Sequence, residues 1–341
     1  MKRLSNPYLP IGAILLAAVL LPLCYAIFVP HKIPVPGPVH LEIKRGDSLS
    51  RITSRLYSSK LIGSEWLFKW TVLASGNDKS FQTGRYRIER DMSVFDLIRL
   101  LKKGNPVLLE VTVPEGTKMA DIFDLLNRAG FRNARRYRET VSHRRFVRSL
   151  GLPSGVEYLE GFLYPDTYKF ADDVSERKII ETMVENFFSR IPANYAKQAE
   201  KIGLSFYKAV ILASIIEKET SAEEERGLIS SVFHNRLNIN MRLQTDPTVI
   251  YGIKNFKGNL TRKQLRTPSK YNTYLNYGLP PTPIANPGLG SLLAAVRPAE
   301  TDFLFFVAMG NGRHKFSVDY RSHLKAVRQY QKRRRKNYRS Y

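Results

Sequence analysis

The sequence predicts an α+β fold preceded by a single membrane-spanning helix. Three observations support this prediction. A long apolar stretch lies near the amino terminus. A short alternating strand followed by an amphipathic helix then occurs three times before residue 131. The remaining chain has the periodicity of longer helices separated by loops, so strands and helices do not alternate regularly as they do in doubly wound α/β proteins.

The composition narrows the class of protein and of partner. The chain has 341 residues, enough for about two domains, and its 43% hydrophobic content is ordinary for a globular protein. A net charge of +24 favours a polyanionic partner: nucleic acid, anionic lipid or an acidic polymer. Cys24 is the only cysteine, and the six histidines lack metal-ligand spacing. We therefore expect no metal and no cofactor.

The amino terminus predicts a single-pass anchor in the cell inner membrane. Residues 11–29 are almost wholly apolar, close to the ~20 residues that span a bilayer. Lys2 and Arg3 precede this stretch, so the amino terminus is expected in the cytoplasm and the rest of the chain in the periplasm. A cleaved signal peptide is the alternative, but the apolar run exceeds its usual length. This location argues against nucleic acid. We assign residues 1–30 to the anchor and the proline-rich residues 31–39 to a stiff linker.

Residues 40–110 are predicted to form a small α/β module. Two of the three strand-and-helix units lie here, with the strands near residues 40–44 and 86–89. The first unit contains the turn Gly46-Asp47-Ser48, and the β-turn-helix pattern resembles LysM-type modules, which bind N-acetylated sugar chains. A generic α+β unit that only packs and orients its neighbours is the alternative.

Residues 111–330 are predicted to form a mostly helical α+β catalytic domain. Helices are expected at residues 176–190, 194–219, 221–237 and 319–331, a long loop region at 265–291, a strand at 303–308 and a turn leading into residues 314–317. Residues 331–341 form a basic tail, for which contact with anionic lipid or cell wall is expected.

The segment of residues 209–220 carries the most chemical information. Its first eight residues are apolar apart from Ser214, which predicts a buried helix that ends in Glu217 and Glu219. A carboxyl group against apolar surface is hard to ionise, and a raised pKa suits a general acid at neutral pH. Spacing alone does not choose between the two carboxyl groups. A solvated glutamate, or one paired with Lys218 or Arg226, fits the same pattern.

The loops that follow are rich in asparagine, glutamine, threonine and tyrosine, notably at residues 241–252, 269–274 and 278–288. Such side chains hydrogen-bond sugar hydroxyl and acetamido groups, and aromatic rings stack on sugar faces. The same loops are also rich in asparagine, glycine and proline, which build turns. Both interpretations stay open from composition.

Six segments together closely resemble the YceG-like (MltG) family of endolytic murein transglycosylases. They are residues 160–168 (EGFLYPDTY), 213–220 (ASIIEKET), 235–237 (NRL), 243–248 (LQTDPT), 271–274 (YNTY) and 278–284 (GLPPTPI). The resemblance implies a membrane-bound lytic transglycosylase that cuts nascent peptidoglycan between MurNAc and GlcNAc, leaves 1,6-anhydroMurNAc ends and terminates strand elongation. It also implies association with peptidoglycan synthases.

The family's catalytic glutamate is the first in the Glu-Lys-Glu-Thr motif, which corresponds to Glu217. We select the following as candidate substrate-binding residues around it: Ser214, Gln244, Asp246, Tyr251, Asn272 and Tyr274. Two other functions remain as alternatives. One is a non-catalytic, membrane-anchored scaffold that binds peptidoglycan, and the other is a nucleic-acid-binding protein that uses the basic run at residues 332–336.

Overall fold

The computed structural model describes residues 38–44, 46–76, 81–88, 91–104, 108–131, 133–153, 156–171 and 174–331, together with residues 18, 22, 24, 25 and 27–29. Most of the predicted anchor, most of the linker and nearly all of the basic tail therefore lie outside the described residues. Within the described part, no helix has the length and apolar character needed to cross a membrane. The predicted α+β class is confirmed.

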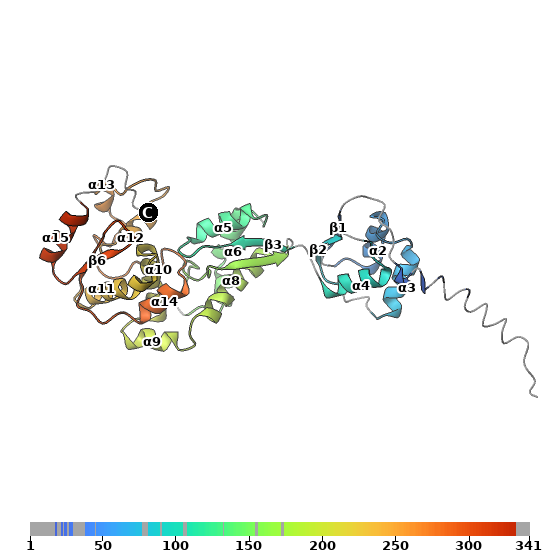
Figure 1. Cartoon of the computed structure of the whole chain (residues 1–341), viewed down its shortest axis with the longest axis horizontal. Coiled ribbons are helices and arrows are strands. Elements are labelled where there is room, and N and C mark those ends of the chain that lie inside the picture. The colour runs from blue at the N-terminus through green and yellow to red at the C-terminus, as the bar shows by residue number, and fades with distance from the viewer. Residues whose placement is uncertain are drawn as a thin grey trace, which may run out of the picture. The chain divides into compact units, whose positions relative to one another are not determined.

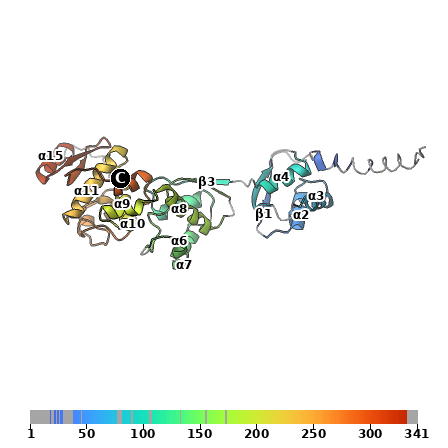
Figure 2. The same ribbon diagram turned by 90° about the horizontal axis from the view of Figure 1, so that it is seen from below.

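The chain forms two compact units (Figure 1). The first comprises Met1–Leu109 with Lys169–Asp173, and the second comprises Glu110–Tyr168 with Val174–Tyr341. Figure 2 shows the same two bodies from a second direction. Each unit is described by itself below.

The first unit has the order β1 (Val39–Ile43), α2 (Leu49–Ser58), α3 (Glu65–Ala74), β2 (Gly84–Ile88) and α4 (Val94–Lys103). The two strands pair antiparallel, with Leu41 opposite Tyr86, and their alternate side chains enter a core shared with the helices. A serine caps each helix by accepting a backbone N–H: Ser48, Ser64 and Ser93. The LysM-like character of this module stays a prediction.

Helix α3 is absent from the sequence-based expectation. Its ten residues, EWLFKWTVLA, carry large apolar side chains on both the buried and the exposed side. Such a segment has no amphipathic stripe, and the stripe is the main sequence signal for a surface helix.

The order continues with β3 (Leu108–Thr112) and β4 (Thr167–Ala171), which form a two-stranded sheet. Three helices lie between the strands in sequence: α5 (Met119–Arg128), α6 (Ala134–Ser142) and α7 (Arg144–Ser149). After β4 come α8 (Glu176–Arg190), α9 (Tyr195–Lys201), α10 (Phe206–Glu219), the short helix η1 (Glu223–Glu225), α11 (Arg226–Asn238), α12 (Asp246–Tyr251), α13 (Arg262–Leu265), α14 (Leu289–Val296), the strands β5 (Phe305–Ala308) and β6 (His314–Ser317), and α15 (Tyr320–Tyr330).

Helix α10 is the centre of the second unit. All eight residues from 209 to 216 are buried, and the helix packs against α9, α11, α12 and α14. The prediction of one continuous helix over residues 194–219 was wrong. Gly203 has φ +77°, which ends α9, and Ser205 caps a new helix by accepting the Lys208 N–H.

The carboxyl-terminal part adds a hairpin and a helix. Strands β5 and β6 pair antiparallel with Phe306 opposite Phe316, and Gly310 and Gly312 in the connection both have positive φ. Asp319 caps α15 by accepting the Ser322 N–H. Helix α15 packs against both strands, which places its inner face beside the carboxyl end of α10 in one pocket.

Candidate active site

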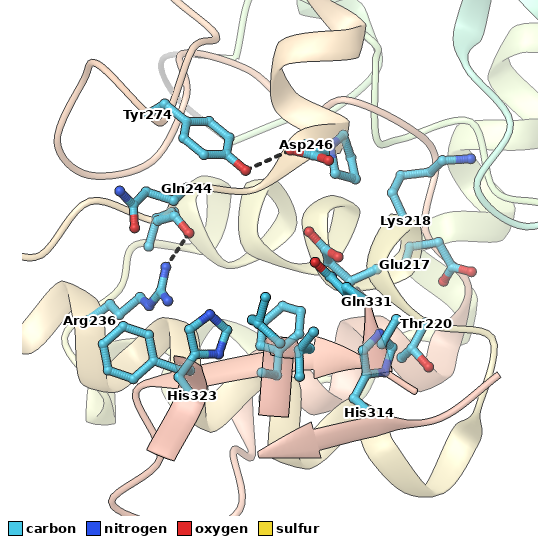
Figure 3. A pocket seen from close by; sticks show the side chains of 18 of the residues that line it. Glu217, Lys218, Thr220, Arg236, Gln244, Asp246, Tyr274, His314, His323 and Gln331 are labelled. Carbon is cyan, nitrogen blue, oxygen red and sulfur yellow. Dashed lines mark hydrogen bonds between the residues drawn. The ribbon is translucent and has the colours of Figure 1, made fainter. Parts of the chain in front are cut away.

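A pocket of about 710 Å³ lies at the carboxyl end of α10. Its walls come from segments far apart in sequence (Figure 3). They are the end of α10 with residues 217–221, Leu243 and Gln244 before α12, Asp246 and Pro247 at its start, Arg236, Tyr274, strand β5 with His314, and four residues of 320–331 on α15 and just after it. Glu217 lines this pocket, and Figure 3 shows Gln244, Asp246 and Tyr274 on one wall and His314 and His323 on another.

Glu217 is half-buried, and its carboxyl group is held at one oxygen. The backbone N–H of Gly288 donates to Glu217 Oε2 at 3.0 Å. Gly288 stands immediately before α14, so this donor belongs to the amino-terminal end of a helix, where backbone N–H groups favour negative charge. Negative charge that develops on Glu217 therefore has a fixed donor.

A second carboxyl group, that of Glu115, lies beside the same glycine. A Cβ atom at Gly288 would stand 1.9 Å from Glu115 Oε1, so a larger residue there would displace this carboxyl group. Desolvation, followed by the charge of Glu217, raises the pKa of Glu115, while Arg226 at 3.6 Å opposes the rise. Sequence analysis assigned Glu115 no role, because 102 positions separate it from Glu217.

Glu219, the other carboxyl group on α10, borders the pocket but is engaged differently. The Thr245 hydroxyl donates to it. Desolvation raises the pKa of Glu219 to about 7, with the charge of Asp246 adding to the rise and Thr245 and Arg236 opposing it. Its carboxyl group thus ties α10 to the loop before α12.

Three of the predicted substrate-binding residues line the pocket together with Glu217. The Tyr274 hydroxyl donates to Asp246 Oδ1 at 2.6 Å, and burial together with this acidic neighbour raises the pKa of Tyr274. Gln244 is exposed and has φ +48°, which is uncommon for a residue with a side chain, and its N–H donates to the Thr273 carbonyl. The three residues form a polar wall that faces the Glu217 side of the pocket.

The structure places the other three predicted residues away from the pocket lining. Ser214 is fully buried; its hydroxyl donates to the Ile211 carbonyl and accepts the Ile284 N–H. Asn272 is also fully buried and donates to two loop carbonyl groups. Tyr251 donates to Glu160 at 2.9 Å. The polar groups that were predicted to bind sugar are therefore engaged in hydrogen bonds within the protein.

Glu160 and Asn286 form a buried polar network. Glu160 is 4% exposed and accepts hydrogen bonds from the Met119 N–H, the Tyr251 hydroxyl and the Asn286 amide. Desolvation raises the pKa of Glu160 to about 7, while the hydrogen bonds from Met119 and Tyr251 and the charge of Lys118 oppose the rise. Asn286 Oδ1 accepts the Gly161 and Leu163 N–H groups at 2.9 Å.

This network positions the loops that touch Glu217. The Gly116 N–H donates to the Asn286 carbonyl, and the Asn286 N–H donates to the Thr117 carbonyl. Gly288 follows two residues later. Glu160 lies in the predicted motif at residues 160–168 and Asn286 in the polar loop at residues 278–288, but neither residue was assigned a role from the sequence. No cluster of His, Cys, Asp and Glu suited to a metal ion occurs among the residues that the structure describes.

Comparison with known proteins identifies the family. A curated protein of Bacillus subtilis, named endolytic murein transglycosylase, is 35% identical over 86% of this chain and 84% of its own length. A protein of the same name from Streptococcus pneumoniae is 27% identical over 79% of this chain, which spans 54% of that relative. The crystal structure of a YceG-like protein from Listeria monocytogenes matches with a TM-score of 0.59 and 33% identity, covering 85% of this chain and 99% of that one. The YceG-like family profile matches residues 41–329, and the chain belongs to this family.

Proposed function

We propose that this protein is an endolytic lytic transglycosylase that cleaves nascent peptidoglycan, with Glu217 as its acid and base. The observation that carries the proposal is the position of Glu217: it lies in the last turn of the buried helix α10, lines a pocket of about 710 Å³ and accepts a backbone hydrogen bond from Gly288. The names of the bacillar and streptococcal relatives support the substrate and the type of reaction.

The reaction needs one carboxyl group that changes roles. Protonated Glu217 donates its proton to the glycosidic oxygen between MurNAc and GlcNAc, and the bond from MurNAc C1 to that oxygen breaks. GlcNAc leaves with a free 4-hydroxyl group, while positive charge develops on the MurNAc ring. Ionised Glu217 then accepts the proton of the MurNAc 6-hydroxyl, whose oxygen attacks C1 and closes the 1,6-anhydro ring. Because the nucleophile belongs to the same sugar, its effective concentration is high and no activated water is needed.

The surroundings of Glu217 suit both roles. The Gly288 N–H favours negative charge on Glu217 after proton donation, whereas an ionised Glu115 nearby disfavours it. Glu217 therefore has both a backbone donor and a second carboxyl group close to it. Glu219 is less suited, because Thr245 occupies its carboxyl group and the bond fixes the adjoining loop.

The polar wall opposite Glu217 supplies the groups for orienting sugar. In this proposal Gln244, Asp246 and Tyr274 hydrogen-bond the hydroxyl and acetamido groups of the glycan. The hydrogen bond from Tyr274 to Asp246 holds the carboxylate in place and leaves its second oxygen as an acceptor.

The proposed location is the inner membrane, with residues 11–29 as the anchor and the catalytic unit in the periplasm. The apolar, uncharged character of those residues and the preceding Lys2 and Arg3 support it. A periplasmic catalytic unit has access to nascent strands and to the synthases that make them.

Product analysis of a matched pair of variants tests the proposal. Purified peptidoglycan is digested with the wild type, with Glu217→Gln and with Glu219→Gln, and the fragments are analysed by mass spectrometry. We expect anhydro ends from the wild type and from Glu219→Gln, whose amide can still accept from Thr245, and none from Glu217→Gln. Glu200 is exposed on α9, and Glu200→Gln is the control for effects of protein preparation on activity.

Three other outcomes would contradict the proposal. Reducing ends would indicate a hydrolase. Anhydro ends lost in Glu219→Gln but kept in Glu217→Gln would make Glu219 the acid. No anhydro ends from the wild type, combined with intact binding to peptidoglycan, would favour the non-catalytic scaffold.

A further inference from the structure

Helix α3 of the first unit exposes an apolar face that no described segment covers. Trp66, Trp70 and Leu73 are spaced four and three residues apart, as on one side of a helix, and are 66%, 55% and 41% exposed. The two indole rings lie 6.3 Å apart. The opposite side of the helix buries Phe68 and Val72 completely. Large exposed aromatic groups that lie side by side mark an interaction surface.

Cationic groups accompany this face. Lys69 is exposed between the two tryptophans along the helix. Helix α4 contacts α3, and its own exposed residues are Phe95, Arg99, Lys102 and Lys103. The Arg99 guanidinium group lies 5.8 Å from the centre of the Phe95 ring. Tryptophan beside lysine and arginine is the composition of surfaces that sit at the boundary between water and lipid headgroups.

The end of the predicted anchor meets the same part of the unit. Phe28 belongs to the final residues of the predicted span, and its ring centre is 5.5 Å from that of Phe95. Both Figures 1 and 2 show the described residues around Phe28, in dark blue, beside α3 and α4. If the span ends at the membrane surface, this contact holds α4 at the level of the headgroups. The predicted linker, residues 31–39, lies almost wholly outside the described residues and stays a prediction.

We propose that the exposed face of α3, formed by Trp66, Trp70 and Leu73, inserts into the headgroup region of the phospholipid bilayer that holds the anchor. The exposed cations of α3 and α4 contact anionic headgroups. The first unit is then attached to the membrane at two places, the anchor and α3. Two attachments fix the orientation of this unit on the membrane. The inference rests on the proposed anchor and is independent of the cleavage reaction.

A bilayer fits this face better than a glycan strand. A sugar site needs hydrogen-bonding groups beside the rings, but here the face continues into Leu73 and Ala74. The Glu65 carboxyl group at the start of the helix already accepts from the Ser54 hydroxyl at 3.1 Å. Lys69, which lies between the two tryptophans in sequence, donates to the Ser50 hydroxyl at 3.4 Å and carries the positive charge that suits a phosphate.

Tryptophan fluorescence tests this inference without a label, because Trp66 and Trp70 are the only tryptophans in the chain. The full-length protein is placed in nanodiscs of phosphatidylethanolamine and phosphatidylglycerol, and the emission is compared with that in nanodiscs whose acyl chains carry bromine. Bromine quenches tryptophan on contact. We expect loss of most of the emission when the bromine lies near the headgroup, and a smaller loss when it lies at the bilayer centre. Trp66→Phe and Trp70→Phe, each with one remaining tryptophan, should both be quenched.

Each other outcome overturns the inference. The face is free of lipid if the tryptophans emit as they do in water and bromine quenches them at neither depth. Emission that responds only to added soluble glycan strands would assign the face to sugar. If the protein does not copurify with nanodiscs, the anchor is absent and the inference fails with it. None of these results affects the proposed reaction, which the anhydro-end assay decides separately.

Discussion

The wall of the pocket around Glu217 and the network around Glu160 are both built on glutamates from the family motifs, yet they differ in how their carboxyl groups are used. Glu217 accepts the Gly288 N–H and faces open space. Glu160 is 4% exposed and accepts three hydrogen bonds from three different segments. A carboxyl group that borders a pocket can exchange a proton with a ligand, whereas one surrounded by protein donors holds the fold.

The largest effect on activity should come from Glu217→Gln. The amide can still accept from Gly288 but cannot donate the catalytic proton, so the rate of anhydro-end formation should fall by about 10²- to 10⁴-fold. The free energy of unfolding should stay close to that of the wild type, because the side chain is half-buried and keeps its shape. Rate assays and urea titration of the same preparation measure both. A large loss of stability would mean that Glu217, like Glu160, mainly stabilises the fold.

The largest effect on stability should come from Asn286→Ala. This change leaves the buried Gly161 and Leu163 N–H groups without their acceptor and removes the donor to Glu160. Each buried group left unpaired costs about 1–3 kcal/mol, so a loss of several kcal/mol is expected in urea titration. Asn276, which is exposed and also donates to loop carbonyl groups, is the matched control. Equal stability losses in the two alanine variants would contradict the role of Asn286 as the centre of the network.

The buried network should also make stability depend on pH. Burial raises the pKa of Glu160 from 4.5 to about 7. A carboxyl group with a raised pKa binds its proton more tightly in the folded state, so its contribution to stability is complete below pH 4.5 and is lost as the pH rises through 7. Glu219 has the same shift and the same sign. We expect the free energy of unfolding to fall between pH 5 and pH 8, and to fall less in Glu160→Gln. If the free energy of unfolding of Glu160→Gln depends on pH as in the wild type, Glu160 is excluded as a cause of this dependence.

A smaller and more specific effect is expected from Glu115→Gln. It removes a neighbouring charge from Glu217 while keeping the shape beside Gly288. The pH optimum of cleavage should move to lower pH, with a rate change of about tenfold or less, equivalent to about 1.4 kcal/mol. The pH profile of kcat/KM measures this shift. Glu110 is exposed, and Glu110→Gln should leave the pH profile of kcat/KM unchanged. A uniform fall in rate without a shift would mean that Glu115 acts only through packing.

Much of the local structure could be predicted from the sequence. The apolar run before Glu217 predicted the buried core helix α10, helical periodicity predicted α8, and alternation predicted the strands β1 and β2. These features depend on contacts within a few residues, which the order of side chains determines. The family motifs directed attention to the right segments but not to the role of each polar residue in them.

What the sequence by itself determined is therefore the α+β class, the buried helix that ends in two carboxyl groups, and the family to which the chain belongs. Only the tertiary structure decided that Glu217 faces the pocket beside Gly288, that Ser214 and Asn272 point inward, and that Glu115 meets the site. The physical reason is the distance along the sequence over which each feature is determined. Helix period and caps are set by neighbouring residues, whereas the direction of a loop side chain depends on which distant backbone groups need a partner once the core has packed.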